Sequence, residues 1–135
     1  MTTRQSGRVY DTGEPMKYML MYWADDAADP EADNNDAFLA ELRAWVEGMD
    51  DNGTRLYGGP LRYAWDAKLL RVRDGEMLVS DGPFAETKEQ IGGYDVIECP
   101  DLAAALKVAA AHPLARSCTV EVRPVDLLPW EPGAQ

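Results

Sequence analysis

The order of apolar patterns along the chain is the feature that most constrains its fold. A strand-like run, a helix-like segment and a second strand-like run occur twice, from Lys17 to Gly59 and from Gly93 to Val125. Between the two copies, residues 69–80 are strand-like on both sides of Asp74-Gly75, a pair that favours a two-residue hairpin turn. This order predicts an α+β, ferredoxin-like split βαβ fold with an inserted β-hairpin.

Two segments have the pattern of helices. The first has N-cap candidates at 34–36, a stop at Gly53 and apolar residues at helical spacing. Its apolar residues are Phe38, Leu42, Trp45 and Met49. The second is Ala-rich, begins after Asp101 and ends at Pro113. Because its side chains are small, it can lie close to a sheet but fills only a thin layer.

The first strand is apolar on both faces, which predicts that both faces are covered. Its alternating sets are Tyr18, Leu20 and Tyr22 on one face, and Met19, Met21 and Trp23 on the other. We expect helices on one face and a second subunit on the other, and therefore a homodimer. The last strand has an apolar face and a polar face that carries Glu121 and Arg123. We expect Asp95 of the preceding strand on that polar face.

The charge of the chain excludes some partners. Its 135 residues carry a net charge of −11. Nucleic acids and anionic membranes are bound mainly through Lys and Arg, so neither is expected as a partner. The longest apolar run, Met19 to Ala24, is too short to span a bilayer, and residues 1–15 lack the apolar stretch of a signal peptide. We therefore expect a cytoplasmic protein.

The sequence indicates no metal site and no cofactor. Cys99 and Cys118 lie in apolar, β-like contexts and are expected to be free thiols. Together with His112 they lack the short spacing of metal ligands. His112 precedes Pro113 at a helix end, where the helix dipole favours a cation, and a structural role is expected for it. Gly58-Gly59-Pro60 is neither a phosphate-binding loop nor a dinucleotide fingerprint.

The segment from Ser80 to Tyr94 is the main candidate for a functional site. Gly82-Pro83 favours a chain reversal beside Asp81, our candidate catalytic residue. Burial there would raise the pKa of Asp81 towards that of a general base, and the alternative is an aspartate that only forms the turn. Phe84 is either a substrate platform or a core plug under the loop. Lys88 either counters the charge of a substrate or is a solvated loop charge.

Three further residues are candidates for substrate binding. Tyr22 and Tyr94, together with Trp23, could line an aromatic pocket for a planar substrate or belong to the core or a subunit interface. Arg123 could anchor a carboxylate through its guanidinium fork or form an internal ion pair with Glu121.

The motif DGPFAETKEQ at residues 81–90, followed by Gly92-Gly93-Tyr94, resembles the DGPF branch of the YCII-related family. The resemblance implies a ferredoxin-like domain that pairs into a dimeric α/β barrel and begins near Met16. From this resemblance we expect an N-terminal extension at 1–15, a domain at 16–130 and a short C-terminal segment at 131–135.

The resemblance implies two kinds of function. One is the binding of a small polar or aromatic metabolite in a dimer cleft, with cofactor-independent, isomerase-like or lyase-like chemistry. The other is a non-catalytic regulatory partner of an extracytoplasmic-function sigma factor. Shorter YCII-type proteins carry a histidine near the start of the first helix that is thought to pair with an aspartate. Residues 35–38 of this chain, Asn-Asp-Ala-Phe, contain no histidine, so that dyad is absent, which favours the regulatory function.

Overall fold

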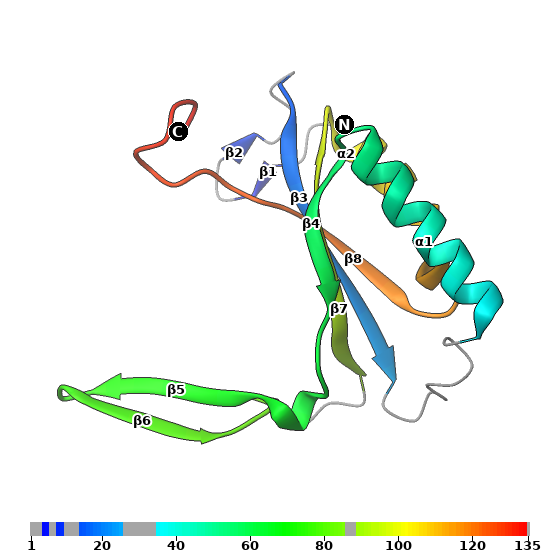
Figure 1. The fold of residues 1–135 in the computed structure, drawn as a ribbon. Helices are drawn as coiled ribbons and strands as arrows, with labels where there is room; N and C mark the ends of the chain where they lie inside the picture. Colours follow the sequence, from blue (N-terminus) through cyan, green and yellow to red (C-terminus); the bar gives the residue numbers. More distant parts are fainter. Residues whose placement is uncertain (1–3, 6–7, 10–13, 26–34, 86–88, 135) are drawn as a thin grey trace.

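The computed structural model describes residues 4–5, 8–9, 14–25, 35–85 and 89–134. Across its main sheet the strands follow the order β4 (Arg55–Pro60), β7 (Glu89–Cys99), β3 (Met16–Asp25) and β8 (Thr119–Pro124). All neighbouring strands are antiparallel. Helices α1 (Asp36–Asp51) and α2 (Leu102–Ala110) both lie on one face of this sheet (Figure 1). The α+β, ferredoxin-like arrangement predicted from the sequence is confirmed.

The remaining elements are short. Strands β5 (Lys68–Arg73) and β6 (Glu76–Asp81) form the inserted hairpin, and β1 (Arg4–Gln5) pairs with β2 (Arg8–Val9). The described residues also include two 3-10 helices, η1 (Ala64–Asp66) before the hairpin and η2 (Pro113–Arg116) before β8.

Both helices begin at the predicted caps. The side chain of Asn35 accepts a hydrogen bond from the Phe38 amide at 2.8 Å, and that of Asp101 accepts one from the Ala104 amide at 2.8 Å. Past the end of α1, Gly53 has a φ of +78°, a conformation that costs glycine no steric penalty. The indole of Trp45 joins the helices by donating to the Val108 carbonyl at 3.1 Å.

The hydrophobic core lies between the sheet and the two helices. Its buried residues are Tyr18, Leu20, Tyr22, Trp45, Ile97, Cys99, Ala105 and Ala109. The small residues of α2 let this helix approach the sheet closely, as its Ala-rich sequence predicts.

Asp95 lies on the helix-covered face of the sheet and not, as expected, on the face of Glu121 and Arg123. It pairs in register with Leu20 of the core and is 5% exposed. The residues that face the other way include Met21 and Val96, which are also buried although both helices lie on the opposite side. The first strand therefore buries apolar side chains on both faces.

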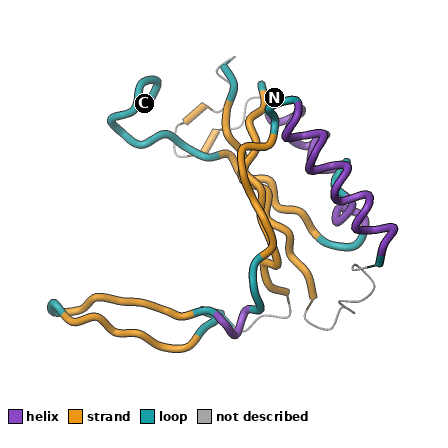
Figure 2. The backbone as a smooth tube through the Cα atoms, viewed as in Figure 1, coloured by secondary structure: helices purple, strands orange, loops and turns teal. Residues whose placement is uncertain are grey.

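The hairpin, called the arm below (residues 68–81), projects away from the main sheet (Figure 2). Its register is the predicted one, with Leu70 opposite Val79 and Val72 opposite Met77. Asp74 and Gly75 both have positive φ, 52° and 78°, as a type I′ turn requires.

Candidate functional site

A hollow of about 530 Å³ lies at the base of the arm. Its apolar wall comes from the end of β3, the start of β7 and the loops on both sides of the arm. This wall consists of Trp23, Leu61, Tyr63, Pro83, Phe84 and Ile91. The polar lining residues are Arg62, Asp66 and Gln90. A concave apolar surface with a few polar groups is the usual form of a small-molecule site.

Hydrogen bonds connect the chain segments that form this hollow. The Gly82 amide donates to the Ala67 carbonyl at 2.9 Å, which ties the exit of the arm to its entry. The Leu61 amide donates to the Gly92 carbonyl at 2.9 Å, and the Gln90 side chain donates to the Ala85 carbonyl at 3.0 Å. The wall is thus attached to β7 rather than carried by a free loop.

The polar side chains around the hollow form two groups. Arg62 donates to the Asp66 carboxylate at 3.0 Å. The Trp23 indole donates to Glu121 at 3.0 Å, and Glu121 also accepts a hydrogen bond from Arg123. Arg123 is therefore linked to the wall of the hollow through Glu121, but it does not line the hollow itself.

Asp81 is exposed, contrary to the expected burial. Its side chain is 83% exposed and forms an ion pair with Lys68, directly across the arm. The hydrogen bond and the charge of Lys68 hold the pKa of Asp81 below its usual value. The carboxylate is therefore kept ionised and is a weaker base than a buried aspartate would be. Two and three residues later, Pro83 and Phe84 line the hollow.

The other candidate residues are distributed over three places. Phe84 lines the hollow and is 77% exposed. Tyr94 makes an edge-on ring contact with Tyr57, at a centroid distance of 6.4 Å. Tyr22 is buried beneath the helices. Lys88 lies outside the described residues.

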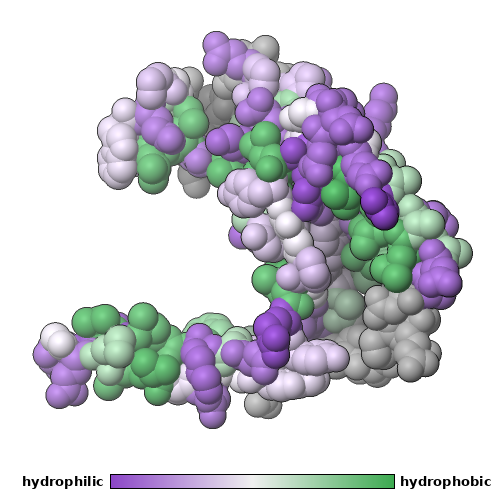
Figure 3. All heavy atoms as spheres, in the orientation of Figure 1, coloured by the Kyte–Doolittle hydropathy of each residue, from purple (hydrophilic) through white to green (hydrophobic). Residues whose placement is uncertain are grey.

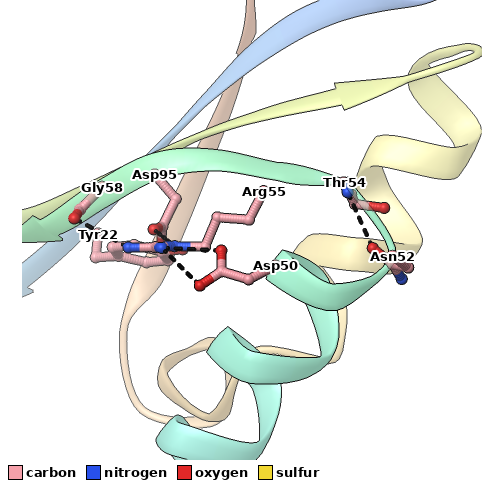
Figure 4. Close-up of polar contacts among 7 residues, drawn as sticks. All are labelled: Tyr22, Asp50, Asn52, Thr54, Arg55, Gly58 and Asp95. Carbon is pink, nitrogen blue, oxygen red and sulfur yellow. Dashed lines mark hydrogen bonds and ion pairs between the residues drawn. The ribbon is translucent and has the colours of Figure 1, made fainter.

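A second group of polar residues surrounds the buried Asp95 beside α1, where this carboxylate accepts two hydrogen bonds (Figure 4). The Tyr22 hydroxyl donates to Asp95 at 2.6 Å, and Arg55 Nε donates to its other oxygen at 2.6 Å. Arg55 also donates to the Gly58 carbonyl at 2.9 Å and to Asp50 at 3.1 Å. We call Tyr22, Asp50, Arg55 and Asp95 the Arg55 cluster.

The Arg55 cluster has the electrostatics of a structural ion pair. The side chains of Arg55 and Asp95 are 14% and 7% exposed, so each charge depends on the other. Burial, the hydrogen bond to Asp95 and its charge together raise the pKa of Tyr22, which keeps the phenol neutral. Burial alone would lower the pKa of Arg55, but its bonds to Asp95 and Asp50 outweigh burial and raise it.

His112 is buried beside this cluster and is neutral, contrary to the expectation that the helix end favours a cation. Its ring stacks on Tyr22 with a centroid distance of 4.4 Å, and its Nδ1 accepts a hydrogen bond from the Leu114 amide at 3.0 Å. Burial lowers the pKa of His112 to about 4, although the charge of Asp95 acts in the opposite direction. Desolvation therefore outweighs the charge of Asp95 and keeps the ring neutral at neutral pH.

We expect His112 to make the protein less stable at acid pH. The unfolded chain protonates this residue below about pH 6.5, whereas the folded chain excludes the proton until about pH 4. Lowering the pH from 7 to 5 should therefore cost about 2 kcal/mol of unfolding free energy. Urea unfolding at both pH values measures the loss. In His112→Asn, which keeps an acceptor for the Leu114 amide, the part of the loss that comes from protonation of His112 should be absent. An equal loss in both proteins would contradict the assignment.

The remaining observations limit the chemistry. Within the described ranges, no three His, Cys, Asp or Glu side chains gather as metal ligands. Cys99 and Cys118 are free thiols. Burial, and then the nearby Asp101 and Glu98, raise the pKa of Cys99, so it is not an activated nucleophile. No helix in the described part of the chain is long and apolar enough to cross a bilayer.

These features define a small α+β protein with a ferredoxin-like sheet, a polar cluster under its helices and an apolar hollow beside an inserted hairpin. The YCII-related domain family matches residues 16–131, and the chain belongs to this family. The chain is similar to the uncharacterized protein R00369 of Rhizobium meliloti (strain 1021), with 46% identity over 69 residues. The matched stretch covers 50% of this chain and 54% of that protein, about half of each.

The sequence pattern does not single out Arg55, Asp50 or the 61–67 segment as parts of a site. One signal for the cluster is Gly58-Gly59, because glycine inside a strand often marks a close approach by another group. A Cβ on Gly58 would lie 2.1 Å from an Asp95 oxygen. For the hollow, the sequence points to Trp23 and Phe84 but not to the 61–67 segment that lies with them, since residues distant in the sequence build this site.

Proposed function

We propose that this protein binds a small, planar, uncharged metabolite in the hollow at the base of the arm. The observation that carries the proposal is the composition of the wall, where aromatic and aliphatic side chains surround three polar residues. Such a site takes the flat apolar body of a ligand and fixes its orientation through a few hydrogen bonds. Pro83 and Phe84, from the motif that resembles the DGPF branch, are part of this wall.

The charge of the protein supports an uncharged ligand. A net charge of −11 repels anions from the surface, and near the hollow both Arg62 and Arg123 already have carboxylate partners. A ligand with a hydrogen-bonding edge can form hydrogen bonds with Gln90, Asp66 and Arg62. Because such a ligand is uncharged, binding does not require the desolvation of a charge on it. The proposal therefore favours aromatic or heteroaromatic compounds that carry amide, hydroxyl or ring N–H groups.

In its catalytic form, the proposal includes a cofactor-independent isomerase-like or lyase-like reaction with Asp81 as the base, although Asp81 lies beside the hollow and does not line it. The ion pair with Lys68 keeps Asp81 ionised and ready to accept a proton, but its lowered pKa limits its strength as a base. Binding is therefore the primary proposal. The proposal also includes a cytoplasmic location and a homodimer.

Indole is a suitable first probe because it is planar, uncharged and has one N–H donor. We expect indole to raise the melting temperature of the full chain and to shift the NMR signals of residues around the hollow. Phe84→Ala should weaken its binding about fivefold, because an aromatic contact contributes about 1 kcal/mol. The side chain is 77% exposed, so the fold should be unaffected.

Tyr57→Ala is the matched control, since Tyr57 is 58% exposed and does not line the hollow. It should leave indole binding unchanged. An equal loss in both variants would contradict the assignment of the site. If neither indole nor a set of planar amides and phenols binds, the metabolite proposal fails. The non-catalytic partner of an extracytoplasmic-function sigma factor then becomes the better hypothesis.

A further inference from the structure

One face of the arm is apolar and uncovered. In each strand, alternate side chains point to the same face, and the two cross-strand pairs Leu70–Val79 and Val72–Met77 are neighbours on it. Their exposed fractions lie between 56% and 68%. An isolated two-stranded hairpin is marginally stable in water, so an arm with this apolar face needs a surface to pack against.

The chain after β8, called the tail below (residues 125–134), presents a second uncovered apolar group. Leu127, Leu128 and Trp130 are 44%, 51% and 79% exposed. The tail is nevertheless held in a defined turn, since the Leu128 amide donates to the Glu131 side chain at 2.6 Å and the Glu131 amide donates to the Leu128 carbonyl at 2.9 Å. The Val125 amide ties its start to β3 through the Lys17 carbonyl at 2.9 Å.

The arm and the tail project from opposite ends of the sheet face that the helices leave open (Figure 1). Figure 3 shows this side of the molecule hollowed between them, with apolar side chains along the arm and on the tail. When two copies face each other across a two-fold axis that exchanges these ends, the arm of each copy meets the tail of the other.

The charges favour a second copy in this orientation. Residues 68–81 contain three basic and three acidic side chains, so the arm is neutral in a chain of net charge −11. The tail carries Asp126 and Glu131 and no basic residue. Two tails placed together would repel each other, whereas the apolar face of the arm carries as charges only the ion-paired Lys68 and Asp81 and can lie against a tail without net repulsion.

We propose that the apolar face of the arm docks on the tail of a second copy, and that the two reciprocal contacts hold the homodimer together. Leu70, Val72, Met77 and Val79 of one copy then cover Leu127, Leu128 and Trp130 of the other. This inference rests on the proposed homodimer and names the surfaces that form it.

Light scattering of the full chain and two arm variants tests the contact. The wild-type protein should have twice the mass of the 15.0 kDa chain. Met77→Asp places a charge on the apolar face and should raise the dimer dissociation constant at least tenfold. Ser80→Asp adds the same charge on the opposite face of the arm and should leave the constant within about twofold of the wild type. Both sites are exposed, so each monomer should fold normally.

Cysteine cross-linking tests the orientation. The variants Met77→Cys and Pro129→Cys are prepared separately and together, each also carrying Cys118→Ser so that the native thiol cannot react. Pro129 is chosen as the position in the tail because its replacement leaves Trp130 in place. Co-expression of the two single variants should give a disulfide-linked dimer that joins one arm to one tail. Each variant alone should give little cross-linked product.

The outcomes separate the two proposals. A single-chain mass at high concentration overturns both the homodimer and this contact. A dimer that Met77→Asp does not weaken leaves the homodimer in place and overturns the contact. Efficient cross-linking of Met77→Cys alone shows arms packed on arms, which also overturns it.

Discussion

Replacing Asp95 with alanine is expected to lower the free energy of unfolding by about 3–5 kcal/mol. The change leaves the guanidinium of Arg55 in a site where its side chain is only 14% exposed, with Asp50 as its remaining carboxylate. It also removes the acceptor of the Tyr22 hydroxyl, which is hydrogen-bonded in the core. Urea or thermal unfolding of the purified variant measures the loss.

Two controls separate the buried pair from its exposed neighbour. Asp50→Asn should cost less than about 1 kcal/mol, because the Asp50 side chain is 45% exposed and solvent already screens its charge. Asp95→Ala combined with Arg55→Met should recover part of the loss, since no buried charge is then left without its partner. A loss below about 1 kcal/mol for Asp95→Ala would show that solvent reaches Arg55 in the variant.

Gly58→Ala is expected to destabilise the protein by more than about 3 kcal/mol or to prevent folding. A Cβ at this position would lie 2.1 Å from Asp95 Oδ1, 2.4 Å from the Tyr94 carbonyl oxygen and 2.7 Å from Asp95 Cα. Two of these atoms belong to the backbone of β7, so a side-chain rotation cannot relieve the contact. Strand β4 would have to separate from β7 at the residue that supplies a carbonyl to Arg55.

Gly59→Ala is the matched control, because a Cβ there meets no atom within 4 Å. It should change stability by less than about 1 kcal/mol. Circular dichroism and thermal unfolding of both variants provide the comparison. Equal stability of the two variants would mean that β4 moves aside without cost.

The arrangement of helices and strands could be predicted because local patterns encode it. The caps at Asn35 and Asp101, the Asp74-Gly75 turn and the pairing of Leu70 with Val79 follow from residues close in the sequence. The two βαβ units then leave few antiparallel topologies, and the observed strand order is one of them.

The surroundings of individual side chains could not be predicted in the same way. Asp95 looked like a member of the polar face, but its register opposite Leu20 turns it towards the helices. The partner that makes its burial tolerable, Arg55, is 40 residues away in the sequence. Likewise, the partner of Asp81 is Lys68 across the arm, and this ion pair lowers the pKa that burial would have raised.

The sequence alone predicted the two main helices, the strands of the main sheet and the arm, and the apolar character of both faces of the first strand, because the periodicity of side chains within one element sets these features. The order of these elements along the chain then predicted the ferredoxin-like topology. Only the tertiary structure decided which charges pair, where the hollow lies and that His112 is neutral. These properties depend on distances and solvent exposure between residues far apart in the chain. A register shift of one residue would reverse the side-chain directions of a whole strand.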